Sequence, residues 1–505
     1  MKPHVSLPKY TMNIKELSTS SFIENAYGVS KELGIPIFLV GGIIRDFLLT
    51  SKIGKDFDFA VDGSSREVAG LYAYKTGGSF FCLDSQREHY RVTIKRETEI
   101  TDIDFSRLQG DTITEDLEKR DFTINSMAIP LRDLFGKDDV MVIDPFHGIT
   151  DLEKGMIRVC SSVAFDDDPL RLLRAARISS VRHLRIENET ERLISEKKRL
   201  LTNTSWERIR DELFQILAVQ NTWRSIEKLQ DLGLLDMVFP EVHSWKDIDQ
   251  GKHHDYNLFG HAIKTVESIE SILINISQYF PAQSFPDYYS IRIREHFDEV
   301  LEKNVTRYGL IKLIAFLHDS GKGKTKRCRG KKAKFLRHEK VGGEINEIIA
   351  KRLKLSRNSI RIVTLVTENH MRILNLTIAD KITKKTQYRF FRDLGKDSID
   401  CLLLSLADGL AKKISGPFLQ KTHLLDIAQD FLRYYFEDWP RIPLKPLMNG
   451  NEIMEFLGIP QGREVGIILS ALREAEGQGY ISTKDEAKAL AKSTHSKIHK
   501  RMTLS

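Results

Sequence analysis

The spacing of apolar residues changes once along this chain, near residue 155, and this change restricts the possible folds. Before it, the runs "IPIFLV" (35–40), "DFDFAVDG" (56–63), "HYRVTIKR" (89–96) and "EITDIDF" (99–105) predict β-strands, with helices between them. After it, apolar positions repeat at helical spacing, as in "SWERIRDELFQILAV" (205–219). The sequence therefore predicts an α+β fold, a mixed sheet with helices followed by all-helical domains.

The chain is too long for a single hydrophobic core. With 505 residues it should form three or four domains. The Pro-rich stretch "WPRIPLKPLMNG" (439–450) is typical of a linker. We expect a head at 1–155, a helical neck at 156–240, a third domain at 241–438 and a helical tail at 439–505.

Composition narrows the class of protein. Lys and Arg number 77 and Asp and Glu 70, a net charge of +7 that permits a polyanionic partner without requiring one. The four cysteines are far apart and form no CxxC pair, which indicates a reducing compartment. No apolar run approaches 18 residues and the first residues do not suggest a signal peptide. We expect a cytoplasmic protein with no membrane partner.

Two carboxylates stand in an otherwise apolar strand. Asp56 and Asp58 are two residues apart, so they should project to one face while Phe57 and Phe59 project to the other. Solvated acids at a strand end are the simple interpretation. A hard-metal site is the alternative, because Mg²⁺ is bound by one or two carboxylates together with substrate phosphates.

A glycine pair precedes these acids. Gly41 and Gly42 follow the first strand and open a helix, where a phosphate could approach the backbone. The pattern "LVGGIIRDFLL…KDFDFAVDG", which includes Arg45, resembles the head of the class II tRNA nucleotidyltransferases and bacterial poly(A) polymerases, a branch of the polymerase-β-like nucleotidyltransferases. The resemblance implies a polymerase-β-like head with Asp56 and Asp58 as catalytic ligands of Mg²⁺.

Further motifs follow in the order of that family. "EDLEKRDFTINSMAI" (115–129) is similar to its RRDxxxN motif, with Lys119 in place of the first Arg. By this resemblance Arg120 would contact the triphosphate, and Asp121 and Asn125 the ribose. Asp104, in "DIDF", could supply a third carboxylate from a neighbouring strand. The attacking group would be an RNA 3′-hydroxyl and the leaving group pyrophosphate.

Base selection without a template requires protein groups that read the base. "FDDDPLRLLRAAR" (165–177) resembles the family motif that faces the incoming base, with Asp167 where the family has Glu. Asp168 and Arg171, three residues apart on a predicted helix, could accept from an amino group and donate to a ring acceptor, which selects CTP and ATP. A surface salt bridge is the simpler alternative. The nucleotide-binding set implied by the resemblance is Gly41, Gly42, Arg45, Arg120, Asp121, Asn125, Asp167, Asp168, Arg171, Arg174 and Arg177.

A second set of chemical residues lies among the later helices. Five stretches with histidine or aspartate follow one another in an order that resembles the HD phosphohydrolase domain. They are "NLFGHAIKTVE", "IAFLHDSGK", "FLRHEKVGG", "TENHMRI" and "LLSLADGLA". The resemblance implies a divalent metal (Mn, Ni, Fe or Mg) that would activate water against a phosphate ester. The implied ligands are His261, His318, Asp319 and Asp408, with His338 and His370 available for a second ion.

Three further stretches are less specific. His253 and His254 are expected in a loop, and the basic stretch 321–340 is expected to be a loop that could hold phosphates. Residues 446–491 resemble the tail of tRNA nucleotidyltransferases, where a tRNA contact is expected, and "KSTHSKIHKRMTLS" (492–505) is expected to fray.

The sequence thus favours a template-independent nucleotidyltransferase that adds CCA, or only CC or A, to tRNA 3′ ends from CTP and ATP. A poly(A) polymerase is the alternative within the class. An HD phosphohydrolase whose head serves as an RNA-binding module is the alternative of another class. The oligomeric state is left open.

Overall fold

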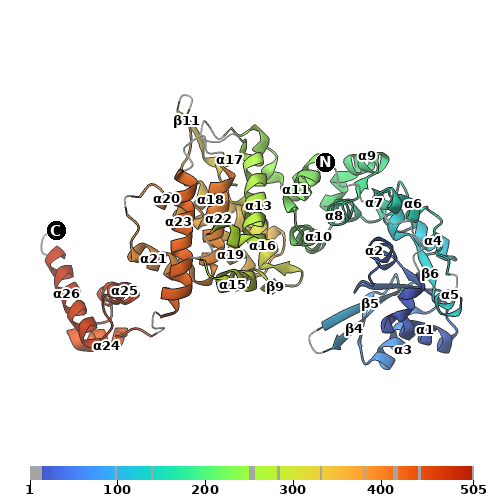
Figure 1. The fold of residues 1–505 in the computed structure, drawn as a ribbon, viewed down its shortest axis with the longest axis horizontal. Coiled ribbons are helices and arrows are strands. Elements are labelled where there is room, and N and C mark those ends of the chain that lie inside the picture. Colours follow the sequence, from blue (N-terminus) through green and yellow to red (C-terminus); the bar gives the residue numbers. More distant parts are fainter. Residues whose placement is uncertain are drawn as a thin grey trace. The chain divides into compact units, whose positions relative to one another are not determined.

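The structure is a computed structural model that describes residues 14–96, 99–137, 140–249, 256–280, 285–329, 332–379, 381–412, 419–441 and 445–502. The chain forms two compact units (Figure 1). The first comprises residues 1–212 with 228–238, and the second residues 213–227 with 239–505.

The first unit contains one six-stranded mixed sheet. Its strand order is β3 (Ser79–Asp84), β4 (His89–Arg96), β5 (Glu99–Arg107), β2 (Phe57–Val61), β1 (Ile37–Val40) and β6 (Ala128–Pro130). All neighbours are antiparallel except β2 and β5, which run parallel. The four strands predicted from apolar runs are confirmed, whereas β3 and β6 were not predicted.

One face of this sheet is buried under helices. Helices α1 (Ser21–Leu33), α3 (Ser65–Thr76) and α5 (Leu131–Gly136) pack against the strands. The ring of Phe57 lies 5.1 Å from that of Phe22 in α1, and the ring of Phe105 lies 5.1 Å from that of Tyr72 in α3. Since side chains alternate along a strand, the opposite face is left for polar groups.

The rest of the first unit is mostly helical. A short parallel ribbon joins β7 (Met156–Ile157) to β8 (Arg185–Ile186). The helices are α2 (Gly42–Thr50), α4 (Ile113–Glu118), α6 (Gly148–Glu153), α7 (Ala164–Asp167), α8 (Arg171–Arg182), α9 (Asn188–Lys197), α12 (Leu235–Val238) and the first residues of α10 (Trp206–Ala218). Most of α11 (Thr222–Asp231) belongs to the second unit.

The second unit is a helical bundle. Its core helices are α13 (Leu258–Ile274), α16 (Arg307–Leu317), α18 (His338–Arg352), α19 (Arg357–Asn369) and α22 (Ser398–Ala411). Around them lie α14 (Ile276–Tyr279), α15 (Asp287–Phe297), α20 (Met371–Leu376), α21 (Lys384–Leu394) and α23 (Leu419–Arg433). One antiparallel ribbon is formed by β9 (Val300–Glu302) and β10 (Val305–Thr306).

The basic stretch 321–340 is more ordered than a loop. It contains α17 (Lys322–Thr325), an antiparallel pair of β11 (Lys326–Arg329) and β12 (Lys332–Phe335), and the start of α18. The expectation of a loop was therefore wrong for the described part of this stretch, where residues 326–329 pair through the backbone with residues 332–335. His253 and His254 lie outside the described residues.

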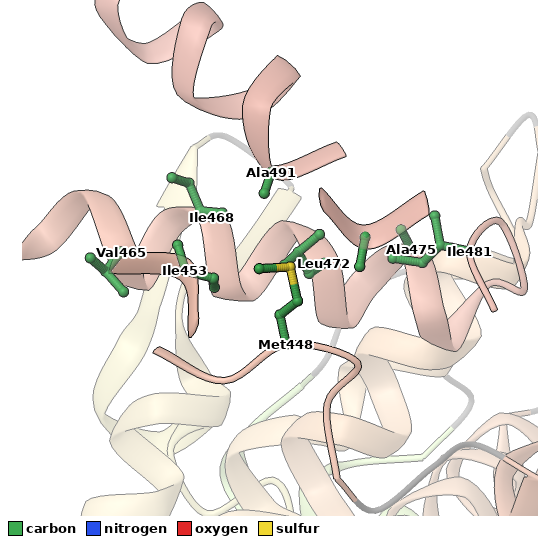
Figure 2. Close-up of a cluster of buried hydrophobic side chains, with 9 residues drawn as sticks. Met448, Ile453, Val465, Ile468, Leu472, Ala475, Ile481 and Ala491 are labelled. Carbon is green, nitrogen blue, oxygen red and sulfur yellow. The ribbon is translucent and has the colours of Figure 1, made fainter. Parts of the chain in front are cut away.

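The tail folds around its own apolar cluster (Figure 2). It consists of α24 (Gly450–Leu457), α25 (Arg463–Gly477) and α26 (Lys484–Met502). The expectation that the chain frays from residue 492 was wrong, since α26 continues to Met502. Ala487 and Ala491 are buried in the cluster and Ile498 packs against it, which holds this helix in place.

Candidate functional site

Three carboxylates meet on the polar face of the head sheet. Asp58 lies in β2 directly opposite Asp104 of the parallel strand β5, and Asp56 precedes β2 by one residue. Phe57 and Phe59 are buried on the opposite face. The prediction that the acids and the phenylalanines point to different faces is confirmed, and Asp104 joins the acids.

The charges of these carboxylates repel one another. Burial, together with repulsion by Asp104 and Asp56, raises the pKa of Asp58 to about 6, although nearby Arg120 acts in the opposite direction. A carboxylate with a raised pKa in a cluster of like charges is stabilised by a cation placed among them. The donor set, all oxygen, fits a hard ion such as Mg²⁺.

Asp104 is positioned by a partner that the sequence did not reveal. Arg91, its neighbour on β4, donates from Nε to one carboxylate oxygen at 2.7 Å and from Nη2 to the other at 2.8 Å. Burial would raise the pKa of Asp104, but the hydrogen bonds from Arg91 and His89 lower it. Asp104 therefore carries a negative charge beside Asp58. The alternation of "HYRV" could have indicated Arg91, since it shares the face of the acids.

The glycine turn lies against the same acids. Gly41 has φ +81°, and a Cβ there would lie 3.1 Å from Asp58 Oδ2 and 3.5 Å from Arg120 Nη1. At Gly42, the first residue of α2, a Cβ would lie 3.1 Å from the Arg45 guanidinium. A side chain at Gly41 would thus occupy the space between the acid and the arginine.

A chain of hydrogen bonds links the predicted nucleotide-binding residues. Arg45 Nη1 donates to Asn125 Oδ1 at 2.5 Å, Asn125 Nδ2 donates to Asp121 Oδ1 at 2.9 Å, and Arg174 Nη1 donates to Asp121 Oδ2 at 3.0 Å. Burial would raise the pKa of Asp121, but Arg174 and Asn125 lower it below its ordinary value. Asp121 is therefore an ionised, buried anchor for Asn125 and Arg174.

Arginines from helix α8 complete this network. Arg174 and Arg177 both donate to the buried Glu212 of α10, at 3.3 and 2.6 Å. Arg120 pairs with Asp116 at 2.9 Å while its Nη1 faces Gly41. Glu212, which the sequence interpretation missed, is the residue that fixes the two arginines; it lies in the helical run "SWERIRDELFQILAV" (205–219).

The expected geometry of Asp168 and Arg171 is corrected by the structure. They do not share a helix: Asp168 is extended (φ −148°, ψ 98°) after α7, and Arg171 opens α8. The cause is Pro169, because the residue before a proline avoids the helical region. Asp167 is exposed at the end of α7.

Both side chains have partners within the first unit. Asp168 accepts from Arg208 Nη2 at 2.8 Å. Arg171 donates to three backbone carbonyls, those of Lys119, Arg120 and Ala164, at 2.7, 3.4 and 3.2 Å. Arg171 therefore braces the turn that carries Arg120.

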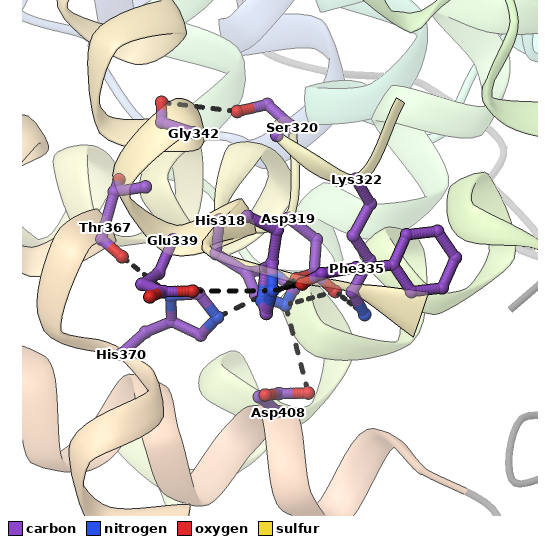
Figure 3. Close-up of polar contacts among 12 residues, drawn as sticks. His318, Asp319, Ser320, Lys322, Phe335, Glu339, Gly342, Thr367, His370 and Asp408 are labelled. Atoms are coloured by element: carbon purple, nitrogen blue, oxygen red, sulfur yellow. Dashed lines mark hydrogen bonds and ion pairs between the residues drawn. The ribbon is translucent and has the colours of Figure 1, made fainter. Parts of the chain in front are cut away.

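The second cluster brings all six predicted histidine and aspartate residues together. Figure 3 labels four of them, His318, Asp319, His370 and Asp408. Asp319 lies at its centre: its carboxylate oxygens are 3.4 Å from His261 Nε2, 3.2 Å from His318 Nε2, 3.2 Å from His338 Nε2 and 3.7 Å from His370 Nε2. Asp408 Oδ1 is 3.0 Å from His261 Nε2. The side chains come from five separate helices or helix ends and are all buried.

Three of these imidazoles are oriented by the backbone in the same way. The Nδ1 atoms of His318, His338 and His370 lie 2.7 to 2.9 Å from the carbonyl oxygen three residues earlier. A carbonyl can only accept, so Nδ1 carries the proton and Nε2 presents a lone pair. Metal-binding histidines are held in this manner.

The lone pairs find few hydrogen-bond donors. Within the described residues, the Nε2 atoms of His318, His338 and His370 and both carboxylate oxygens of Asp319 are buried without a hydrogen bond of good geometry. Burial, together with repulsion by His318, lowers the pKa of His370 to about 3, so its ring is neutral. These groups fit a borderline divalent metal.

Two lysines border this cluster and were not singled out in the sequence. Lys322 Nζ is 2.6 Å from Asp319 Oδ2, and Lys412 Nζ is 3.1 Å from Asp408. They follow the acids by three and four residues on helical turns, a spacing that could have identified them. They place positive charge beside the two aspartates of the cluster.

Two family models match parts of the chain. Residues 37–158 match the poly A polymerase head domain, and residues 183–246 match the probable RNA and SrmB-binding site of polymerase A. The first range contains the three carboxylates, the glycine turn, Arg45, Asp121 and Asn125.

No described helix is both long and apolar enough to cross a membrane.

Known proteins resemble the chain over most of its length. A CC-adding tRNA nucleotidyltransferase of Geobacter sulfurreducens is 29% identical over 90% of this chain and 91% of the relative. An A-adding tRNA nucleotidyltransferase of Deinococcus radiodurans is 28% identical over 89% and 94%. The solved Thermotoga maritima CCA-adding enzyme complexed with tRNA shares the fold, with a TM-score of 0.59, 23% identity and 96% coverage of both chains.

Proposed function

We propose that this chain is a template-independent tRNA nucleotidyltransferase that adds C and A residues of the 3′-terminal CCA from CTP and ATP. The observation that carries the proposal is the placement of Asp56, Asp58 and Asp104 beside the glycine turn and Arg120. Similarity to CC-adding and A-adding relatives over nine-tenths of the chain supports the choice of tRNA as substrate.

In the head, Asp56 and Asp58 would hold Mg²⁺, with Asp104 beside them. Mg²⁺ would neutralise charge on the triphosphate and favour attack by an RNA 3′-hydroxyl with release of pyrophosphate. Arg120 would bind phosphate oxygens next to the open space at Gly41. Asp121 would hold Asn125 toward the ribose of the nucleotide.

We assign base selection to Asp168 and Arg171. A carboxylate accepts from the amino group that cytosine and adenine share, and a guanidinium donates to the adjacent ring acceptor. Arg208 Nη2 donates to Asp168 Oδ2 at 2.8 Å and so orients this carboxylate, which supports this role. Arg174 and Arg177, fixed by Glu212, would add positive charge beside the nucleotide.

We keep four domains as part of the proposal: a catalytic head at 1–155, a neck at 156–240, an HD domain at 241–438 and a tail at 439–505. The neck would bear the base-reading residues and the tail would contact tRNA. A cytoplasmic location follows from the use of tRNA, CTP and ATP.

The test is nucleotide incorporation on defined tRNA ends. Purified chain is incubated with Mg²⁺, each labelled nucleotide alone, and tRNA that ends before CCA, after C, after CC or after CCA. Addition of C only, of A only, or of both distinguishes the three forms of the activity. A long adenosine run would indicate the poly(A) polymerase alternative, and no incorporation on any end would refute nucleotide transfer.

A second function is favoured by the buried histidine–aspartate cluster. His261, His318, Asp319 and Asp408 would hold one divalent metal, and His338 and His370 would serve a second. The metal would supply an activated water for hydrolysis of a phosphate ester. The supporting observation is that three Nε2 lone pairs are fixed by backbone carbonyls and point to one acidic centre.

Hydrolysis of cyclic nucleotides and of RNA ending in phosphate, measured with Mn²⁺, Ni²⁺, Fe²⁺ and Mg²⁺, tests this second activity. Asp319→Ala should remove it and leave nucleotide addition intact. Hydrolysis without any incorporation would favour the alternative in which the head only binds RNA. Absence of hydrolysis with every metal would refute the second activity alone.

A further inference from the structure

A third group of possible metal ligands lies in the tail. It comprises Glu464, the second residue of α25, and His495 and His499 of α26. His495 Nε2 and His499 Nε2 are 3.2 Å apart, and they lie 3.3 and 3.1 Å from Glu464 Oε1. The three atoms thus form a nearly equilateral triangle.

The packing of α26 explains how this triangle arises. Ala487, Ala491, His495 and His499 follow one another at intervals of four residues, so they lie along one stripe of the helix. The two alanines are buried in the tail's apolar cluster, which also contains Val465, the neighbour of Glu464 (Figure 2). The histidines continue the stripe beyond the cluster and meet the start of α25.

The carboxylate oxygen is not satisfied by ordinary hydrogen bonds. Among the described residues, Glu464 Oε1 is buried and receives no hydrogen bond of good geometry, although two imidazole nitrogens lie within 3.3 Å. Each neutral imidazole carries a single N–H. A cation in front of the triangle would satisfy Glu464 Oε1 and could be bound by the two imidazole nitrogens as well.

The dimensions of the triangle select the type of ion. Ligands about 2.0–2.1 Å from a tetrahedral Zn²⁺ are about 3.3–3.4 Å apart, close to the three observed edges. Mg²⁺ prefers oxygen ligands alone in octahedral geometry, so two histidines disfavour it. We infer that Glu464, His495 and His499 form a zinc site that joins α26 to α25, with its fourth position open to water.

The site belongs at the surface, where an ion can enter. The side chains of Glu464 and His495 are 27% and 26% exposed, and that of His499 is 57% exposed. The metal would therefore stabilise the last turns of α26, which contribute few buried apolar contacts of their own.

The experiment compares the full chain with His495→Gln/His499→Gln and, as a second variant, Glu464→Gln. The matched control is His147→Gln/His183→Gln, which replaces two histidines of the first unit. Zn²⁺ bound per chain is measured by equilibrium dialysis, and hydrogen exchange of residues 490–502 is followed with and without Zn²⁺. Other zinc-binding groups contribute equally to all variants, so differences in stoichiometry report the tail.

We expect the double variant to bind one Zn²⁺ fewer than the wild type and the control. Zn²⁺ should slow exchange near the end of α26 by about tenfold in the wild type and control only. Glu464→Gln should weaken zinc binding while exchange without metal stays at the wild-type rate, which separates loss of the site from loss of folding. Equal stoichiometry in all chains, or no zinc-dependent protection in the wild type, would overturn the inference.

Discussion

Replacing Asp58 by Asn should stabilise the head while it removes nucleotide addition. Asn keeps the shape of the side chain but removes a charge that Asp104 and Asp56 repel. The two effects have opposite signs, which is typical of a residue retained for catalysis at a cost to folding.

The pKa of Asp58 sets the size and the pH dependence of the effect. Its pKa rises from 3.8 to about 6 on folding. Each pKa unit corresponds to about 1.4 kcal/mol, so the ionised group destabilises the metal-free fold by about 1–3 kcal/mol. Because the folded pKa is the higher one, the wild type loses stability as pH rises from about 4 to 6, and the loss is complete above that range.

The assay is urea unfolding at pH 5 and pH 8 in a chelator, with hydrogen exchange of β2 and β5 as the local probe. Asp58→Asn should be more stable than the wild type at pH 8 by about 1–3 kcal/mol, and the gain should be markedly smaller at pH 5. Mg²⁺ should stabilise the wild type but not the variant. The exposed Asp62→Asn is the control and should change neither property.

Lower stability of Asp58→Asn at pH 8 without metal would refute the repulsion argument. Retention of near-normal incorporation by Asp58→Asn would refute the assignment of Asp58 as a metal ligand. The two failures are independent, because one concerns the metal-free fold and the other the reaction.

Three further predictions concern the remaining parts of the two sites. Gly41→Ala should lower the free energy of unfolding by about 1–2 kcal/mol because of the positive φ of this residue. It should also reduce incorporation strongly, since the new methyl group would lie 3.1 Å from Asp58 Oδ2. The control Gly28→Ala in α1 should change neither unfolding nor incorporation. Arg171→Ala should lower the preference for CTP and ATP over UTP and GTP by about ten- to a hundredfold in single-turnover incorporation; equal slowing with all four nucleotides would assign the residue to bracing alone. Asp408→Ala should abolish any metal-dependent hydrolysis without affecting nucleotide addition. The control Asp426→Ala, at an exposed residue, should leave both activities unchanged. Loss of nucleotide addition in Asp408→Ala would show that the two sites are coupled.

The sequence predicted the features that depend on spacing of two, three or four residues. The alternation of Phe57, Asp58 and Phe59 fixes which side chains share a face of β2, and the structure has them as expected. The union of Asp58 with Asp104 depends on which strands are neighbours and which run parallel. Spacing within one strand does not contain this information, so the sequence could suggest Asp104 as a third carboxylate but not its position opposite Asp58.

Other features were not predicted, either because a local steric signal was overlooked or because they depend on contacts between distant segments. Asp168 and Arg171 have helical spacing, but Pro169 breaks the helix between them, and this steric effect should have outweighed the spacing. The six residues of the histidine–aspartate cluster were predicted from their order along the chain. Three of the rings are fixed by carbonyls only three residues earlier, but the meeting of the six side chains requires the three-dimensional positions of five helices. Helix α26 was expected to fray, but it is held by its contact with α25, which the sequence spacing does not reveal.

The alternation along β2 has a consequence for how this protein can vary. A single inserted or deleted residue within Phe57–Val61 would turn phenylalanine toward the face that carries Asp104 and would turn Asp58 into the packing beneath α1 and α3. Folding and nucleotide addition would both be lost, so no insertion or deletion in this strand can improve one of them at the expense of the other. Length changes among natural variants should therefore be confined to the connections outside β2, and the strand itself should vary by substitution alone.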